Sequence, residues 1–202
     1  MEGELEKNLK ELNETLLLLD NELKDIEYFL SRGTLLGIIR QGSLNAWDDD
    51  IDIGINGFCP AKIKERLINI VENGSGANYT MVKNYKNLKP VGIKFWYEKY
   101  RTIFESRNEQ CYPFEIVYPL REVEYLGRKF RVPNQSEVIL EMWYGDWEVP
   151  SRKTFIYKNT TELVNSPMAY RMQNVQEVYA ECNNKGEIIE PVKITGYTGR
   201  VG

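Results

Sequence analysis

The first regular pattern in the chain is a periodic spacing of apolar residues near the amino terminus. They follow one another at alternating steps of four and three residues, as Leu5, Leu9, Leu12, Leu16, Leu19, Leu23 and Ile26. This spacing predicts a long amphipathic helix over about residues 3–24, with Glu and Lys on its other faces. Such a seam can join a second copy as a coiled coil. Leu17 and Leu18 widen the stripe, which favours packing on a sheet within the domain.

The rest of the pattern alternates between segments typical of strands and segments typical of helices. Strands are expected at residues 26–31, 51–55, 79–84, 91–97 and 112–120, and hairpin segments at 124–133 and 187–195. Helices are expected at residues 61–73, 136–143 and 170–181, the second with Ser136 as its N-cap. The predicted fold class is therefore α/β (α+β), a mixed sheet flanked by helices.

Length and charge limit the function classes. The chain has 202 residues, which suits one catalytic domain over 1–202. A net charge of −4 supplies no basic field for nucleic acid. Because the chain has no histidine, Ser-His-Asp catalysis and His-ligated zinc are excluded. Carboxylates, lysines and arginines must carry any chemistry.

Cysteines and the amino terminus bear on the compartment. Cys59, Cys111 and Cys182 are odd in number and form no C-x-x-C pair, which favours reduced thiols over a disulfide or zinc site. The first residues are acidic and lack an apolar signal core. No apolar run approaches the roughly 18 residues of a membrane span. We expect a cytoplasmic protein without a transmembrane segment.

An acidic run at residues 47–52, Trp-Asp-Asp-Asp-Ile-Asp, stands at the start of one predicted strand. Side chains two apart in a strand share a face, so Asp50 and Asp52 should project together while the intervening isoleucines enter the core. Two carboxylates so placed repel each other unless a cation lies between them, and Mg²⁺ prefers such oxygen ligands. The alternative is a solvated acidic turn before an ordinary strand.

The segment before this run has a second feature, a Gly-Thr turn at Gly33 and Thr34 followed by a short helix. Strand, Gly-Thr turn, helix and a strand with Asp-x-Asp is the order of polymerase-β-type nucleotidyltransferases. A glycine turn lets backbone N–H groups approach a phosphate closely, and the following helix directs its positive end the same way.

Two motifs narrow the resemblance: G-T-L-L-G-x-x-R at residues 33–40 and W-D-D-D-x-D at 47–52. Both match the signature of the LicD and fukutin-related family at every fixed position, so the chain resembles that family. The resemblance covers about residues 24–150, including Tyr-Gly-Asp-Trp at residues 144–147 where the family usually has Y-G-D-x-W, and leaves residues 151–202 as a C-terminal extension.

The resemblance implies a metal site for Mg²⁺, or Mn²⁺, held by Asp50, Asp52 and Glu115. The family places its third carboxylate on a neighbouring strand, and Glu115 is the one acidic residue inside the apolar strand at 112–120. Its side chain should project from the face of the strand opposite to Phe114 and Ile116. The alternative is that it only faces solvent there. Glutamate reaches one methylene farther than the family's usual aspartate.

Five further residues are expected to contact or orient the substrate: Gly33, Thr34, Arg40, Lys94 and Asp48. Gly33 and Thr34 form the phosphate-facing turn, and Arg40 can bind a phosphate bidentately. Lys94 resembles a strand lysine of the family that contacts phosphate, or is an ordinary strand-face lysine.

Asp48 and Asp49 precede the predicted metal ligands. Because residues 42–46 indicate a turn there, Asp48 is not expected to bind the metal directly. It is expected to orient the loop or to lie next to the groups that contact the metal or substrate. Asp49 is expected to face away from the metal ions.

The resemblance implies a Mg²⁺-dependent transferase that moves a phosphocholine or phospho-polyol group from a CDP-activated donor to a sugar hydroxyl of a cell-surface glycan. Its partners would be that small-molecule donor and a glycan acceptor, and the N-terminal helix would permit an oligomer. One alternative is nucleotidyl transfer from a nucleoside triphosphate to a small molecule. Another is an inactive binding protein on the same fold, against which the intact Asp-x-Asp and Gly-Thr motifs argue.

Overall fold

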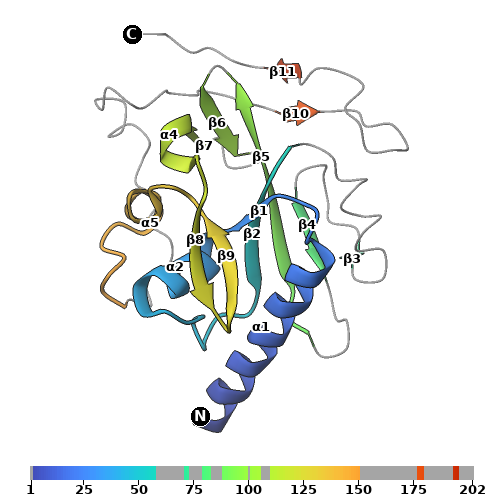
Figure 1. Cartoon of the computed structure of the whole chain (residues 1–202), viewed down its shortest axis with the longest axis vertical. Coiled ribbons are helices and arrows are strands. Elements are labelled where there is room, and N and C mark those ends of the chain that lie inside the picture. The colour runs from blue at the N-terminus through green and yellow to red at the C-terminus, as the bar shows by residue number, and fades with distance from the viewer. Residues whose placement is uncertain are drawn as a thin grey trace.

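One mixed sheet carries the acidic run at the start of an inner strand (Figure 1). The computed structural model describes residues 2–57, 71–72, 79–82, 88–99, 101–105, 110–150, 177–179 and 193–195. Within them the strand order is β1 (Tyr28–Leu30), β2 (Ile51–Asn56), β5 (Val91–Lys99), β4 (Tyr79–Val82) and β3 (Val71–Glu72). β6 (Thr102–Glu105) pairs with the end of β5 and with β7 (Gln110–Pro113). β2 and β5 pair in parallel and the other pairs are antiparallel, so the predicted mixed sheet is confirmed.

Side-chain alternation gives β2 two different faces. Ile51, Ile53 and Ile55 are buried in the core. Asp52 lies opposite Gly92 in the register, and Gly54 lies opposite Lys94. Because residues two apart share a face, Asp52 and Lys94 project from the same side of the sheet. The division of β2 predicted from the sequence is confirmed.

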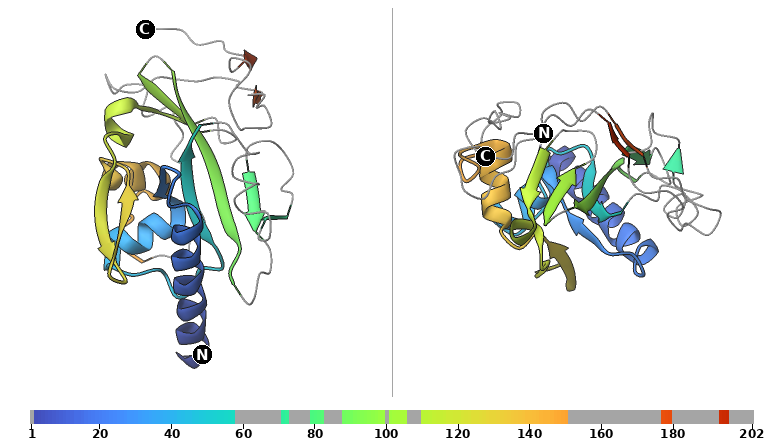
Figure 2. Two further views of the ribbon diagram at one scale, coloured as in Figure 1. Left: turned by 45° about the vertical axis from the view of Figure 1, so that its right-hand side comes forward. Right: turned by 90° about the horizontal axis from the view of Figure 1, so that it is seen from above.

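The N-terminal helix is present as α1 (Glu2–Glu22). Its leucine stripe is buried within the domain from Leu12 to Leu23, as the wide stripe predicted. The amino-terminal end of α1 extends beyond the sheet (Figures 1 and 2), and Leu5 there is exposed. An oligomer through α1 stays a prediction. Among the described residues, none of the helices has both the length and the apolar character of a membrane span.

Two helices meet beside β2. α2 (Arg32–Gln41) packs against β2 and against α5 (Ser136–Tyr144). A hairpin of β8 (Arg121–Tyr125) and β9 (Arg128–Val132) adjoins β1, and Figure 2 shows it from two further directions. An aromatic cluster joins the sheet to α5: the Trp96 ring stacks on Tyr112 at 5.1 Å and meets Trp143 edge-on at 6.4 Å. These contacts fix α2, and with it the Gly-Thr turn, on the sheet.

The strand predicted at residues 112–120 is wrong beyond Pro113. Phe114–Val117 form one helical turn, α4, which the Tyr118 N–H closes by donating to the Phe114 carbonyl. The reason is tertiary: the carbonyls of Ile116 and Val117 accept hydrogen bonds from the backbone that leads into α5, so they are not available to a neighbouring strand.

Three smaller predictions also change. The helix expected at 61–73 lies mostly outside the described residues, but Val71–Glu72 pair with β4 as β3. The helix at 170–181 is wrong over β10 (Glu177–Tyr179), which pairs with β11 (Lys193–Thr195); the other residues of 170–181 and of the arm at 187–195 lie outside the described part. Gln135, not Ser136, is the N-cap of α5, because the Ser136 hydroxyl donates to the Pro133 carbonyl instead.

Candidate metal centre

Two hydrogen bonds fix the Gly-Thr turn, which forms the first turn of α2, to β2. The Ser31 N–H donates to the Asp52 carbonyl at 3.1 Å, and the Asp52 N–H donates to the Thr34 hydroxyl at 2.9 Å. Thr34 is buried, so its hydroxyl is engaged in holding the strand. The turn and the first half of β2 therefore form one unit, and Thr34 sets the position of Asp52.

Gly33 leaves room for a carboxylate. A Cβ at this position would lie 2.5 Å from Asp48 Oδ2, closer than atoms can approach. Asn45 completes the contact, since its amide donates to the Gly33 carbonyl at 3.3 Å and to Asp48 Oδ2 at 3.5 Å. We expected Gly33 to serve the approach of a phosphate; the contact that requires glycine here is with Asp48.

The acidic loop lies against α1 and α2. Gly37 of α2 packs so closely on the loop that a Cβ there would lie 2.6 Å from the Ser43 carbonyl. From α1, the Asn8 amide donates to the carbonyls of Ala46 and Asp48, at 2.8 and 2.7 Å. The loop is thereby held on each side of residue 47.

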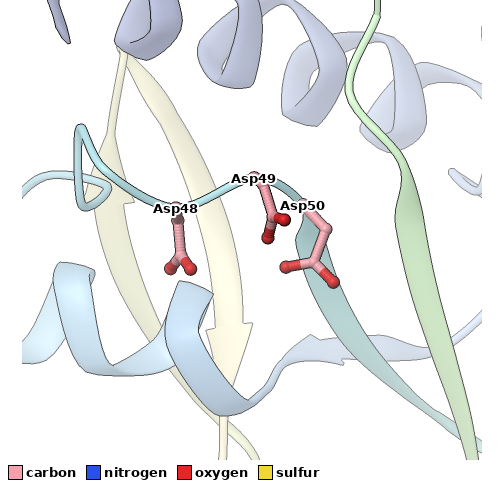
Figure 3. A group of neighbouring side chains, drawn as sticks. All are labelled: Asp48, Asp49 and Asp50. Carbon is pink, nitrogen blue, oxygen red and sulfur yellow. The ribbon is translucent and has the colours of Figure 1, made fainter. Parts of the chain in front are cut away.

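Three aspartates gather at the end of this loop. Oxygens of Asp48, Asp49 and Asp50 lie within 4.8 Å of one another, and Figure 3 shows the three carboxylates on the same side of the loop. The expectation that Asp49 points away from the site is therefore wrong. β2 begins only at Ile51, so the alternation of an extended strand does not apply to residues 48–50.

Asp52 is not a member of this group of three, but it lies beside it. Its Oδ1 is 2.6 Å from Lys94 Nζ, and both side chains are mostly buried. Lys94 is therefore bonded to a carboxylate of the site. The charges of Lys94 and Asp52 both shift the pKa of Asp50. The structure therefore brings Asp50, Asp52 and Lys94 together.

Burial and the neighbouring negative charges raise the pKa values of Asp48 and Asp50. Burial, with the charges of Asp52, Asp48 and Asp49, raises the pKa of Asp50 to about 7, while Lys94 lowers it. Burial raises the pKa of Asp48 to about 6, against a hydrogen bond from Asn45 that lowers it. Several oxygen donors and excess negative charge fit a hard divalent cation such as Mg²⁺.

Arg40 lies at the edge of this group. Its Nη2 donates to Asn45 Oδ1 at 2.8 Å, and its guanidinium carbon is 5.9 Å from the centre of the Trp47 ring. Its Nε is buried and has no hydrogen-bond partner among the described residues. Burial lowers the pKa of Arg40 and the Asp48 carboxylate raises it, which places the two charges near each other.

Glu115 has a different environment. It lies on α4, is exposed, and forms an ion pair with Arg101, whose hydrogen bond lowers the pKa of the Glu115 carboxyl. The sheet neighbours of β2 are β1 and β5, whereas β7 pairs with β6. The expectation that the Glu115 segment lies beside β2 is therefore wrong, and its metal role stays a prediction.

The sequence alone did not point to a buried ion pair beside the Gly-Thr turn. Arg32 Nη2 donates to both carboxylate oxygens of Glu105, at 2.7 and 2.6 Å, and the two side chains are only 3% and 0% exposed. The guanidinium carbon of Arg32 also lies 4.2 Å from the centre of the Trp143 ring. An acidic residue at the end of an apolar strand was the one available signal, but its partner lies far away in the sequence.

Comparison with known proteins agrees with the motifs. A family model described as LicD/FKTN/FKRP, nucleotidyltransferase domain, matches residues 25–135. That span contains the Gly-Thr turn, the acidic loop, Lys94 and Glu115. A search of curated proteins gave no match.

Proposed function

Because the chain belongs to the LicD/FKTN/FKRP nucleotidyltransferase-domain family, we propose that it is a Mg²⁺-dependent transferase acting on a CDP-activated donor. Membership of this family indicates a transferase in general. The phosphocholine or phospho-polyol head group and a sugar hydroxyl as acceptor are our proposal for its donor and acceptor.

The observation that supports this proposal best is the group of carboxylates at the start of β2. Asp48, Asp49 and Asp50 lie together, with Asp52 beside them, and burial raises the pKa values of Asp48 and Asp50. We propose Asp50 and Asp52 as metal ligands, completed by Asp48 or Asp49. Mn²⁺ has the same ligand preference and could substitute.

The metal ion, when bound, would neutralise charge on the donor diphosphate and acidify the attacking hydroxyl. The chain's own groups supply the rest. Arg40 lies at the edge of the site with its charge near Asp48, where its guanidinium can bind a phosphate oxygen. Lys94 holds Asp52 in place from β5. Gly33 lets Asp48 approach the turn.

A thermal-shift titration tests the proposal. Cytidine diphosphate should raise the melting temperature with Mg²⁺ and not with a chelator, because a ligand that binds only the native state stabilises it, by about 2.7 kcal/mol at 100 times its Kd. Asp50→Asn should remove this effect. Glu124→Gln, on the exposed side of β8, is the matched control and should keep it. Failure of every Mg²⁺–nucleotide pair to stabilise the wild-type chain would contradict the proposal.

Nucleotidyl transfer from a nucleoside triphosphate is the second candidate, and the name of the matched family model favours keeping it. The two reactions release different products. Transfer of a phosphate-linked head group from a CDP donor releases cytidine monophosphate, whereas nucleotidyl transfer releases pyrophosphate. Product analysis with each donor class therefore distinguishes them.

A further inference from the structure

Trp47 has an unusual position for a large aromatic residue. Its side chain is 62% exposed, the highest value among the exposed large hydrophobic residues of the described part of the chain. Trp96 and Trp143, by contrast, are fully buried. Trp47 directly precedes the carboxylates Asp48–Asp50. Tryptophan is enriched at binding hot spots, so an exposed ring beside a group of carboxylates is a candidate ligand contact.

The backbone around this ring is fixed. Asn8 binds the carbonyls of Ala46 and Asp48, which flank Trp47, and the Asp48 N–H donates to the Asn45 carbonyl at 3.0 Å. The backbone that carries the ring is already ordered, so ligand binding at Trp47 costs little conformational entropy of the loop.

Arg40 connects the ring with the carboxylate group. Its guanidinium is within cation–π distance of Trp47, and the same guanidinium interacts with the charge of Asp48. A molecule that places phosphates at the carboxylates and a flat ring on Trp47 would contact Arg40 between them. A nucleotide has this combination of groups.

We propose that Trp47 is a specificity-determining residue that stacks against the base of the nucleotide donor. This inference rests on the proposed function. Every base has a π face, so stacking on Trp47 adds affinity for nucleotides over phosphate compounds that lack a base. Contact with the apolar face of a sugar acceptor would instead leave nucleotide affinity unchanged.

Calorimetric titration of two probes tests the stacking. Mg²⁺–cytidine diphosphate has a base and Mg²⁺–pyrophosphate does not. Trp47→Ala should weaken cytidine diphosphate binding by about 5- to 150-fold, the range for loss of one base–aromatic stack, and leave pyrophosphate binding within about twofold. Trp47→Phe should keep most of the affinity. Val149→Ala, at another exposed apolar residue, is the control and should change neither probe.

Fluorescence gives a second readout that does not depend on activity. The chain has four tryptophans, of which Trp96 and Trp143 are fully buried. In a Trp147→Phe background, Trp47 is then the tryptophan accessible to acrylamide. Mg²⁺–cytidine diphosphate should protect it from quenching, and Mg²⁺–pyrophosphate should not.

The outcomes separate this inference from the proposed function. If the wild type binds both probes but Trp47→Ala weakens neither or both equally, or if cytidine diphosphate gives no protection, the stacking is wrong and the metal centre stands. If the wild type binds pyrophosphate but no nucleotide, or neither probe, the nucleotide donor and the role of Trp47 are both wrong.

Discussion

Two groups of charged side chains lie close to the Gly33 turn. One is a buried pair of opposite charges, and the other is a group of like charges. Arg32 and Glu105 are nearly inaccessible to solvent, and each charge has its partner at hydrogen-bond distance. Asp48, Asp49 and Asp50 are like charges gathered within 4.8 Å. The charges of the first group neutralise each other, whereas those of the second group have the same sign.

The difference shows which charges serve the fold and which serve a ligand. In a buried ion pair each charge is neutralised by its partner within the fold, so the pair needs no ligand. In the second group the raised pKa values of Asp48 and Asp50 show an unfavourable burial of negative charge, which a bound cation would relieve. Breaking the pair should therefore damage the fold, whereas neutralising a carboxylate should damage ligand binding.

The largest expected effect is on the buried pair. Glu105→Ala leaves the Arg32 guanidinium buried without its partner, and we expect a loss of about 3–5 kcal/mol in the free energy of unfolding. Urea unfolding followed by circular dichroism measures it. A loss of only about 1 kcal/mol would mean that the pair is solvated, and the contrast between the two groups would disappear.

The control removes both charges together. Arg32→Met with Glu105→Leu replaces the pair by apolar side chains, which in other proteins is often neutral or stabilising. We expect this double variant to be much more stable than Glu105→Ala. If the two variants unfold alike, packing and not charge explains the loss.

The second prediction concerns pH in the metal-free protein. The pKa of Asp50 is raised to about 7 in the folded chain from an ordinary value of 3.8, so the folded state holds this proton more tightly than the unfolded state. Stability from this group is complete below about pH 4 and falls as the pH rises toward 7. Asp48, with a pKa of about 6, adds to the same trend. Melting temperatures in a chelator at about pH 5 and pH 8 measure the decline.

Carboxylates with a lowered pKa, such as Glu11 and Glu137, make stability rise with pH and so mask this decline. Comparing Asp50→Asn with the wild type isolates the contribution of Asp50, because those carboxylates are the same in both proteins. The difference in melting temperature between variant and wild type should favour the variant increasingly as the pH rises. Mg²⁺ should stabilise the wild type at about pH 8 and leave the variant unchanged. A difference that is constant with pH would show that neither burial nor the neighbouring charges raise the pKa of Asp50.

Local patterns predicted the parts of this comparison that depend on local geometry. The alternation of β2 follows from the period of a strand, and the Gly-Thr and acidic motifs could be recognised because each is contiguous. These features placed Asp50 and Asp52 at the start of an inner strand.

Tertiary contacts decided the rest, and a sequence does not display them. Arg32 meets Glu105 across 73 positions. Asp49 lies with its neighbours in the loop before β2 begins, and Glu115 lies on a helical turn because the segment before α5 takes the hydrogen bonds of that backbone. For Arg32 and Glu115 a distant partner, not the local pattern, set the position of the charge.

The third prediction concerns Gly33, which lies between the two groups. In Gly33→Ala the new Cβ meets Asp48 Oδ2, and this flexible carboxylate can rotate away. The gain in helix propensity, about 1 kcal/mol, offsets much of the strain, so stability should change by roughly 1 kcal/mol or less. Mg²⁺ affinity, measured by calorimetry, should fall because Asp48 leaves its place.

Gly3→Ala is the matched control, since Gly3 is also helical and has nothing within 4 Å of the added Cβ. It should be neutral or slightly stabilising and should bind Mg²⁺ as the wild type does. If Gly33→Ala keeps full Mg²⁺ affinity, Asp48 does not contribute to the metal site.

The smallest effect is expected at Glu115, the carboxylate that the family resemblance assigned to the metal. Its exposed side chain is paired with Arg101, and exposed ion pairs of this kind contribute little to stability. Glu115→Gln should therefore leave both the melting temperature and its Mg²⁺-dependent increase with cytidine diphosphate close to wild type. Glu137→Gln, which interrupts the comparable surface pair with Arg121, is the matched control. If Glu115→Gln instead removes the Mg²⁺-dependent increase as Asp50→Asn does, while Glu137→Gln keeps it, Glu115 must reach the metal in the complex. The three-carboxylate site would then be correct, and binding would have to exchange the Arg101 pair for the cation.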